Sequence, residues 1–384
     1  MFDIIVFLIF VPVQLRFTVL WLRAAGRRRA PWNTIARRGV LLLDALLAIG
    51  WILDFVPAFG GPVLLRFAHL VLGTFTTAYS FSAIAIFAVL TALHFLRRAV
   101  HAEFNPGRRR LINAAGNIAV AAPFAALAYG SLIERLDFHV REVDVPIAGL
   151  PADLDGLRLL HISDIHLSAF LSEAQLARVI DSANGLRPHL IAVTGDLISH
   201  KGDPIDACIR QLARLKSDAG TVGCMGNHER VAGVEDYTAK AAARVGIPFL
   251  RKQSRQLRFG SATLNVAGVD YQPLYEKSRY LRGAEHLVLP GATNLLLSHN
   301  PDVFPVAAAQ GYNLMLAGHT HGGQVSVEIF DQAINPARFF TPFVYGLYRR
   351  GPASAYVTRG IGTIGIPARI GAPPEISLLR LRKV

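Results

Sequence analysis

Long apolar segments in the first third of this 384-residue chain limit most strongly what it can fold into. Residues 1–134 contain no lysine, and arginine clusters separate four successive apolar runs. These runs cover approximately residues 4–22, 40–59, 67–95 and 111–132. A helix needs roughly 20 apolar residues to cross a bilayer, whereas core helices of soluble proteins are usually shorter and amphipathic. We therefore predict a transmembrane region of about four helices over residues 1–134.

Four ionisable residues lie in or near these runs: Asp44, Asp54, Arg66 and His69. Ionisable side chains inside a bilayer are costly and often functional. They can also lie near the ends of the spans or pair within the helical bundle. The sequence allows both interpretations.

The arginine clusters predict the orientation of the chain. One cluster lies between the first and second runs and another between the third and fourth, whereas Arg66 alone lies between the second and third. Short loops rich in Lys and Arg stay cytoplasmic. We therefore expect a multi-pass protein of the cell (inner) membrane whose C-terminal portion lies on the extracytoplasmic face. The first run lacks a basic leader and a small-residue cleavage site, so we expect it to be retained.

Charge and composition narrow the possible partners. Of the formal net charge of +13, residues 1–150 supply more than half, with 15 Arg against 8 acidic residues. Membrane topology and attraction to anionic lipid explain such clusters, so the positive charge does not indicate a nucleic-acid partner. Two cysteines, Cys208 and Cys224, are too few for a disulfide scaffold or a thiolate zinc cluster.

The chain changes character after residue 134. We predict a linker over residues 135–151 and a separate α/β domain over residues 152–384, because short apolar runs there alternate with amphipathic stretches. The predicted strands are 157–164, 189–196, 220–227, 262–270, 293–299 and 313–319. The predicted helices are 172–187, 204–216 and 237–245.

Almost every predicted strand ends in Asp, Asn or His. In open α/β sheets a ligand site forms outside the carboxyl ends of the strands. One such ending is common because turns favour Asp and Asn, but five in one domain indicate a site. The candidate ligands are Asp164, His166, Asp196, Asn227, His299, His319 and His321.

These ligands predict a dinuclear metal site. Oxygen and nitrogen donors without sulfur suit Mn, Fe, Zn or Co, and the imidazoles argue against Mg or Ca alone. Seven ligands are too many for one tetrahedral ion and suit two. Two divalent ions about 3.5–4 Å apart can clamp a phosphoryl group and convert a bridging water into hydroxide near neutral pH. We therefore predict a phosphoesterase with two divalent cofactors, most consistent with Mn, Fe or Zn.

The ordered motifs "SDIH", "TGD", "GNHE", "LSHNPD" and "AGHTHGGQ" resemble those of the calcineurin-like metallophosphoesterases over residues 145–384. The resemblance implies a four-layer α/β/β/α sandwich. It implies Asp164, His166 and His321 as ligands of the first metal, Asn227, His299 and His319 as ligands of the second, and Asp196 as a bridging, catalytic carboxylate. His228 matches the family's catalytic histidine that is not a ligand, which steadies the phosphate in the transition state or helps to protonate the leaving group.

The closing segment "YVTRGIGTIGIPARIGAPPEISLLRL" resembles the bacterial membrane-associated branch, which includes envelope phosphodiesterases and pyrophosphatases acting on UDP-diacylglucosamine. Two features differ from that branch. Arg230 stands where an aromatic residue often follows the "GNHE" motif, and four predicted spans replace a single N-terminal segment. Both differences bear on which substrate the protein hydrolyses and not on the predicted metal ligands.

We therefore expect hydrolysis of a phosphodiester or pyrophosphate bond in a membrane lipid or cell-envelope precursor. One alternative is a nuclease or nucleotide phosphodiesterase, although no aromatic–basic groove pattern is evident. The other is a membrane transport or interaction protein with a regulatory phosphoesterase domain. Arg359 and Arg369 can contact a substrate phosphate or make structural pairs, and His161 is expected to pack inside its strand.

Overall fold

The computed structural model describes residues 2–55, 72–99, 122–123, 125–329 and 332–384, together with the single residues 107, 114 and 118. The chain divides into two compact units, Met1–Tyr129 and Gly130–Val384.

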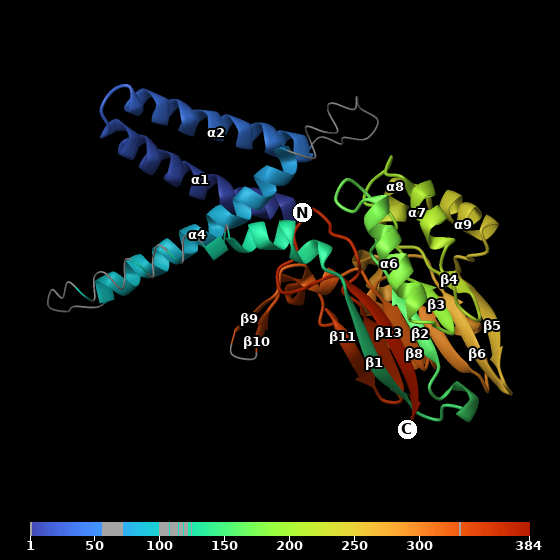
Figure 1. Ribbon diagram of the computed structural model, residues 1–384. Coiled ribbons are helices and arrows are strands. Elements are labelled where there is room, and N and C mark those ends of the chain that lie inside the picture. The colour runs from blue at the N-terminus through green and yellow to red at the C-terminus, as the bar shows by residue number, and fades with distance from the viewer. Residues whose placement is uncertain are drawn as a thin grey trace. The chain divides into compact units, whose positions relative to one another are not determined.

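The N-terminal unit is built from long helices (Figure 1). Their bounds are α1 (Phe2–Gly26), α2 (Trp32–Phe55) and α4 (Thr74–Ala99). Phe10 of α1, Trp51 of α2 and Ile86 of α4 belong to one buried apolar cluster. The three helices therefore share a small core.

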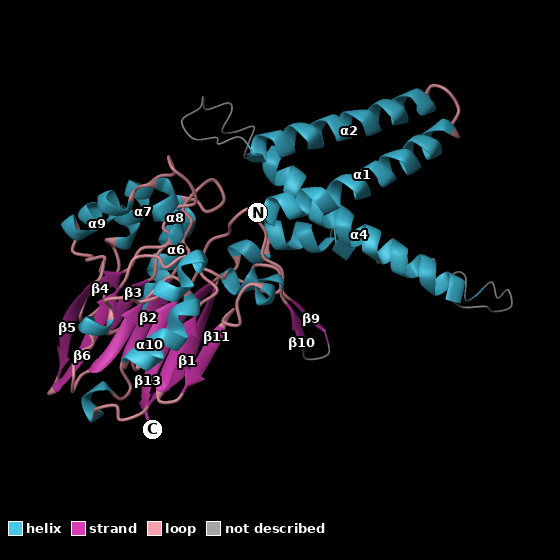
Figure 2. Cartoon of the chain, turned by 180° about the vertical axis from the view of Figure 1, so that it is seen from behind, coloured by secondary structure: helices cyan, strands magenta, loops and turns pink. Residues whose placement is uncertain are grey.

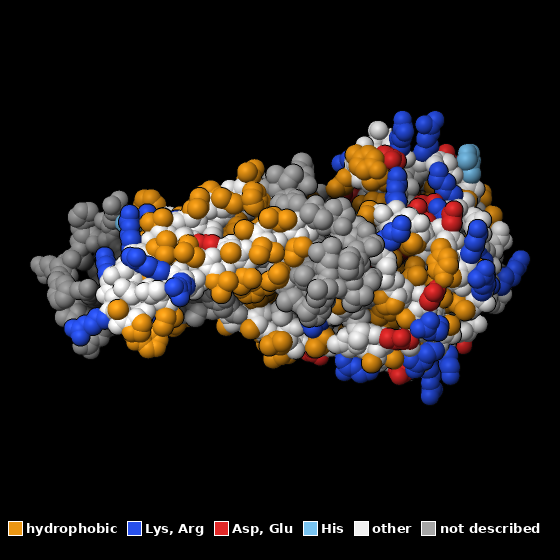
Figure 3. Space-filling model, turned by 90° about the horizontal axis from the view of Figure 1, so that it is seen from above, with side chains coloured by type: hydrophobic (Ala, Val, Ile, Leu, Met, Phe, Trp, Pro, Cys, Tyr) orange, Lys and Arg blue, Asp and Glu red, His pale blue; other side chains and the backbone are white. Residues whose placement is uncertain are grey.

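A polar group is also buried between these helices, and many apolar side chains lie outside. Gln14 Nε2 and Thr18 Oγ1 donate hydrogen bonds to the Asp44 carboxylate at 2.7 and 2.9 Å. Leu15 and Leu42, by contrast, are 62% and 61% exposed, and apolar side chains spread over the helical unit in Figure 3. This arrangement suits helices that face lipid. Asp44 therefore pairs within the bundle; the side chain of Asp54, and all of Arg66 and His69, lie outside the described residues.

The prediction of four membrane spans is not supported. Two of the described helices, Val6–Gly26 and Phe75–Ala92, are long and apolar enough to cross a membrane. The helix α2 is not one of them because arginines and aspartates interrupt its apolar sequence. Much of the fourth predicted run lies outside the described residues.

Two β-sheets form the centre of the C-terminal unit (Figures 1 and 2). The strands of the first sheet are β1 (His139–Ile147), β2 (Arg158–Ile162), β3 (Leu190–Val193), β4 (Thr221–Gly223) and β13 (Glu375–Lys383). Those of the second are β5 (Gln253–Phe259), β6 (Ala262–Gly268), β7 (Thr293–Leu297), β8 (Leu314–Ala317), β11 (Gly346–Arg350) and β12 (Ala353–Val357). The strand orders are β1-β13-β2-β3-β4 and β11-β12-β8-β7-β6-β5. A separate hairpin consists of β9 (Val327–Ile329) and β10 (Gln332–Ile334).

Helices connect these strands. The α-helices are α6 (Glu173–Gly185), α7 (Ile205–Leu212), α8 (Asn227–Ala232), α9 (Glu235–Arg244) and α10 (Phe304–Gln310). The short 3₁₀ helices are η2 (Glu134–Leu136), η3 (Ala152–Leu154), η4 (Leu274–Arg279), η5 (Glu285–Leu287), η6 (Pro301–Val303), η7 (His321–Gly323) and η8 (Pro336–Phe339). At the start of α6, Ser172 and Gln175 form a capping box, as the serine before this helical stretch predicts.

Three apolar clusters separate four layers. Successive strand residues point to opposite faces of a sheet. Leu160 of β2 therefore faces α6, α7 and α9, whereas its neighbour Leu159 faces the second sheet. In the second sheet Leu295 faces the first sheet and Leu296 faces α10. The C-terminal unit is thus an α/β/β/α sandwich, and strands covered on both faces are apolar throughout, which is why six of them could be predicted.

The segment predicted as a linker contains a strand. Within residues 135–151, β1 pairs in parallel with β13 along nine residues, from His139 opposite Glu375 to Ile147 opposite Lys383. The first half of β1 is polar and exposed, and only Val143, Val145 and Ile147 alternate as in a half-buried strand, a signal that the prediction missed. The strands β5 and β11 lie at the edges of the second sheet and also escaped prediction, because much of each is exposed and polar.

Two glycines of α2 test the helix packing of the N-terminal unit. A Cβ atom at Gly50 would lie 1.9 Å from Thr76 Oγ1 of α4, whereas a Cβ at Gly39 has nothing within 4 Å. Alanine favours a helix over glycine by up to about 1 kcal/mol. We expect Gly39→Ala to keep or raise the Tm of the full chain in detergent and Gly50→Ala to lower it. Equal Tm values for the two variants would contradict this packing.

Candidate metal centre

The carboxyl ends of strands from both sheets meet at one edge of the sandwich. The strands β2, β3 and β4 run parallel in the first sheet, and β6, β7 and β8 run parallel in the second. The loops that follow them carry all seven predicted ligands. Asp164 and His166 follow β2, Asp196 follows β3, Asn227 follows β4, His299 follows β7, and His319 and His321 follow β8.

Asp164, His166 and His321 form a first group, whose ligand atoms all lie within 4.8 Å of one another. His321 Nε2 is 3.2 Å from His166 Nε2 and 3.3 Å from Asp164 Oδ1. All three side chains are buried. The two ring nitrogens and the carboxylate oxygen thus gather around one small volume, and this geometry fits a cation between them.

Asp196, His299 and His319 form a second group with the same spacing. His299 Nε2 lies 3.0 Å from Asp196 Oδ2 and 3.1 Å from Asn227 Oδ1. The same Asp196 oxygen is 3.6 Å from His166 Nε2 of the first group. Its carboxylate therefore lies between the two groups, where a bridging ligand would have to be. The structure brings all seven predicted ligands together.

Burial determines the charge balance of this site. Desolvation lowers the pKa of His166 and of His319 to about 3, so both rings are neutral at pH 7 and can bind a metal. Burial also lowers the pKa of His299, but the carboxylates of Asp196 and Asp164 outweigh that effect and raise it to about 10. Burial and the neighbouring Asp196 carboxylate raise the pKa of Asp164. Two buried carboxylates and the neutral rings of His166 and His319 are a donor set that fits divalent cations, and His299 joins it when a bound cation replaces the proton that its ring otherwise shares with Asp196.

The backbone is strained where the ligands are. Five of the seven have positive φ angles, namely Asp164 at 51°, His166 at 49°, Asp196 at 54°, His319 at 74° and His321 at 53°. Each such conformation costs about 1–3 kcal/mol for a residue other than glycine and is typical of functional sites. Glycines allow the loops to approach closely, since a Cβ at Gly318 would lie 2.1 Å from Asp164 Oδ2.

His228 lies beside the two groups. Its ring centroid is 4.7 Å from that of His166, and its backbone N–H donates to Asp196 Oδ1 at 2.8 Å. The side-chain Nδ1–H donates to the Ser199 carbonyl. Within the described part of the chain Nε2 makes no hydrogen bond, so this atom is available to a substrate.

Two residues of the site were not predicted from the sequence. The buried Glu229 carboxylate accepts backbone hydrogen bonds from Asp196 at 2.9 Å, Leu197 at 2.6 Å and Gly226 at 2.8 Å, and so joins two ligand loops. Its place three residues after Gly226 is a capping-box position, a signal that could have identified it. The Tyr271 hydroxyl lies 3.4 Å from His319 Nε2. It follows Asp270, the end of the predicted strand over residues 262–270, but tyrosine is not one of the Asp, Asn and His endings by which the candidate ligands were found.

The two arginines of the C-terminal segment differ in role. Arg369 is fully buried and donates to the carbonyls of His321 at 2.7 Å and Arg359 at 2.9 Å. Burial lowers its pKa to about 10. Arg369 is therefore structural and fixes the loop of a metal ligand, whereas Arg359 is only half-buried. His161 is buried with Nε2 2.7 Å from Thr194 Oγ1, inside its strand as expected.

Comparison with known proteins agrees with this site. The family model of the calcineurin-like phosphoesterases matches residues 157–323. The zebrafish "Transmembrane protein with metallophosphoesterase domain" is 30% identical over 270 residues, covering 66% of this chain and 60% of that protein. The phosphodiesterase YaeI of Escherichia coli is 29% identical over 227 residues, which cover 58% of this chain and 82% of YaeI. The chain thus spans only 60% of the length of the zebrafish relative.

A bacterial relative is covered almost completely. The uncharacterised metallophosphoesterase YkuE of Bacillus subtilis is 30% identical over 278 residues, which are 70% of this chain and 94% of YkuE. The aligned length reaches beyond the segment that the family model matches. On this similarity, the chain belongs to the calcineurin-like phosphoesterase family.

Proposed function

We propose that this protein hydrolyses a phosphodiester or pyrophosphate bond in a membrane lipid or cell-envelope precursor. The observation that carries this proposal is the convergence of seven oxygen and nitrogen donors, five of them buried, in two groups with the Asp196 carboxylate between them. Two divalent ions held there, Mn, Fe or Zn, would polarise phosphoryl oxygens and make a water molecule more acidic.

The chain itself supplies a proton donor. His228 is fixed by its Nδ1–H bond to the Ser199 carbonyl, so its Nε2 is the atom that can hold a proton toward the substrate. We propose that protonated Nε2 stabilises the phosphoryl charge and protonates the leaving oxygen. A positioned general acid of this kind contributes about 10²–10⁴-fold to a rate.

Aromatic residues near the metal centre favour a lipid substrate. Phe339 and Phe340 are 88% and 60% exposed. They follow Asn335, whose Nδ2 donates to the Gly322 carbonyl at 2.6 Å, one residue from the ligand His321. Exposed phenylalanines beside an arginine, here Arg338, suit the interface between water and acyl chains. This surface supports a membrane substrate over a soluble nucleotide.

The orientation of the chain is tested with reporter fusions. We propose that the protein passes the membrane several times and that the catalytic unit lies on the extracytoplasmic face, because the arginine clusters favour cytoplasmic loops. Alkaline phosphatase fused after Val384 is expected to be active and a cytoplasmic β-galactosidase fusion inactive. The reverse pattern would contradict this orientation.

The variant Asp196→Asn tests the proposed chemistry. Because this carboxylate lies between both ligand groups, its loss is expected to reduce hydrolysis of bis(4-nitrophenyl) phosphate by the full chain at least about 100-fold. The measurement is 4-nitrophenolate release in detergent with Mn²⁺, together with metal content. Asp218→Asn, which changes a 75% exposed side chain, is the control. Full activity of Asp196→Asn would rule out the proposed site.

The same pair of proteins tests the substrate class. Incubation of the wild-type chain with envelope extract is expected to convert a phosphorylated lipid or precursor that Asp196→Asn leaves intact. Conversion of nucleotides or oligonucleotides, with no change in the lipids, would instead favour the nuclease alternative.

His228→Asn separates acid catalysis from metal binding. We expect kcat to fall about 10²–10⁴-fold, and to fall further for esters with poor leaving groups, because these depend most on protonation. Metal content, measured by mass spectrometry, is expected to stay at the wild-type level. Loss of metal in parallel with activity would show that His228 is a ligand.

A further inference from the structure

A groove of about 140 Å³ opens in the C-terminal unit and is lined by two arginines and a tyrosine, among other residues. We call it the arginine groove. Its lining includes His139, Arg141, Tyr345, Arg359, Pro374 and Glu375. These residues come from β1, from β13, and from the segments before β11 and after β12. The groove thus spans both sheets.

Two guanidinium groups converge on one aromatic ring in this groove. The Arg359 guanidinium carbon lies 4.0 Å from the centroid of the Tyr345 ring, and that of Arg141 lies 5.2 Å from it. Stacking on an aromatic face fixes a guanidinium without using its N–H donors. Both arginines therefore keep donors for a further partner.

The protein does not neutralise these two charges. Among the described residues, no carboxylate lies within 4.0 Å of either guanidinium. Glu375 lines the groove, but its Oε1 accepts hydrogen bonds from Tyr356 at 2.5 Å and Ser377 at 2.6 Å, and the residue is 3% exposed. His139 pairs with the exposed Asp137 at 3.2 Å. Two like charges held on one ring are unfavourable unless an anion binds between them.

The groove is structurally linked to the metal centre. A Cβ at Gly322, next to the ligand His321, would lie 2.7 Å from Arg359 Cγ. On the other side, a Cβ at Gly360 would lie 2.5 Å from the Cβ of Asp164. The stem of Arg359 therefore packs against the turn that carries His321, and the backbone of the next residue, Gly360, lies against Asp164.

We propose that the arginine groove binds an anionic phosphate group of the substrate other than the one that is hydrolysed. This inference rests on the proposed function. Guanidinium groups bind phosphate through paired N–H donors, and two of them facing one volume select a ligand with a second negative group. The substrate would then be a pyrophosphate or a lipid that carries a further phosphate.

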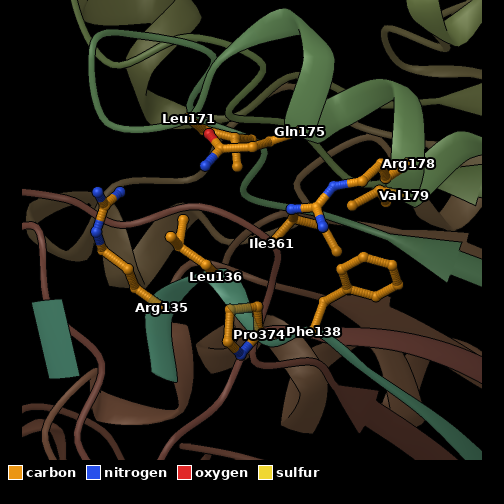
Figure 4. Close-up of a pocket in the computed structure, with 9 residues that line it drawn as sticks. All are labelled: Arg135, Leu136, Phe138, Leu171, Gln175, Arg178, Val179, Ile361 and Pro374. Atoms are coloured by element: carbon orange, nitrogen blue, oxygen red, sulfur yellow. The ribbon is translucent and has the colours of Figure 1, made fainter. Parts of the chain in front are cut away.

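A neighbouring pocket is too small to take that role. The pocket in Figure 4 shares Pro374 with the arginine groove and is lined mostly by apolar side chains, with Arg135, Gln175 and Arg178 beside them. Its volume is about 10 Å³, which is near the lower limit for one water molecule. The arginine groove is thus the better candidate for a phosphate group.

Protection from arginine modification tests the groove without relying on hydrolysis. The full, Mn²⁺-loaded chain in detergent is treated with phenylglyoxal, and the modified arginines are identified by mass spectrometry. Saturating inorganic phosphate or dihexanoyl phosphatidic acid is expected to slow modification of Arg141 and Arg359 at least fivefold. The exposed Arg350 of β11 is expected to react at an unchanged rate.

Two variants complete the experiment, one inside the arginine groove and one outside it as the control. Arg141→Gln changes an exposed residue and should leave the fold intact, yet it is expected to raise the phosphate concentration that protects Arg359 at least tenfold. Arg350→Gln is expected to leave that concentration unchanged. Absence of protection, or equal protection in wild type and Arg141→Gln, would overturn the proposal.

The probes also distinguish the source of the phosphate and the two proposals. If phosphatidic acid protects the arginines at a concentration at least tenfold lower than inorganic phosphate does, the groove binds a lipid headgroup. If the two protecting concentrations are equal, the groove recognises the phosphate group alone. Both results support the groove. Hydrolysis of bis(4-nitrophenyl) phosphate is measured in the same preparations. Protection without hydrolysis would refute the proposed function and keep the groove, whereas hydrolysis without protection would refute the groove alone.

Discussion

Two carboxylates, Asp164 and Asp196, are buried at the ends of neighbouring parallel strands, and the surrounding structure depends on keeping them there. The Asp164 side chain is fully buried and that of Asp196 is 2% exposed. Imidazole rings from the other sheet face them, so bound cations would balance charges that water cannot reach. The positive φ angles of the ligands, the close approach at Gly318 and the three backbone bonds to Glu229 all hold this arrangement.

Two features beside the candidate metal centre are the basis of the proposal of an amphiphilic substrate. On one side the exposed Phe339 ends η8 and the exposed Phe340 follows it, and the preceding Asn335 is bonded to the turn that contains His321. The stem of Arg359 packs against that same turn, and its guanidinium lies in the arginine groove. A ligand that combines apolar chains with more than one phosphate would use both features. The apolar helices of the N-terminal unit agree with such a membrane substrate.

The N-terminal unit differs from the sandwich in its surface. Its core is apolar too and also encloses the Asp44 carboxylate bonded to Gln14 and Thr18, but leucines such as Leu15 are exposed. Four apolar runs predict four spans, whereas two of the described helices are long and apolar enough to cross a membrane. An aspartate that interrupts α2 in the sequence is satisfied by α1 in the structure, which no pattern within α2 itself could reveal.

The sequence by itself determined the family, the six apolar strands and the seven candidate ligands. Strands covered on both faces must be apolar, and a ligand at a strand end directly follows that apolar run. Tertiary structure alone decided what depends on residues far apart in the chain. It revealed β1 in the predicted linker, because its partner β13 lies near the other end of the domain. It also assigned Arg369 to the loop of His321 and left Arg359 facing a groove. Hydrogen bonds and stacking of this kind form only between folded segments, so their physical cause is spatial and not local in sequence.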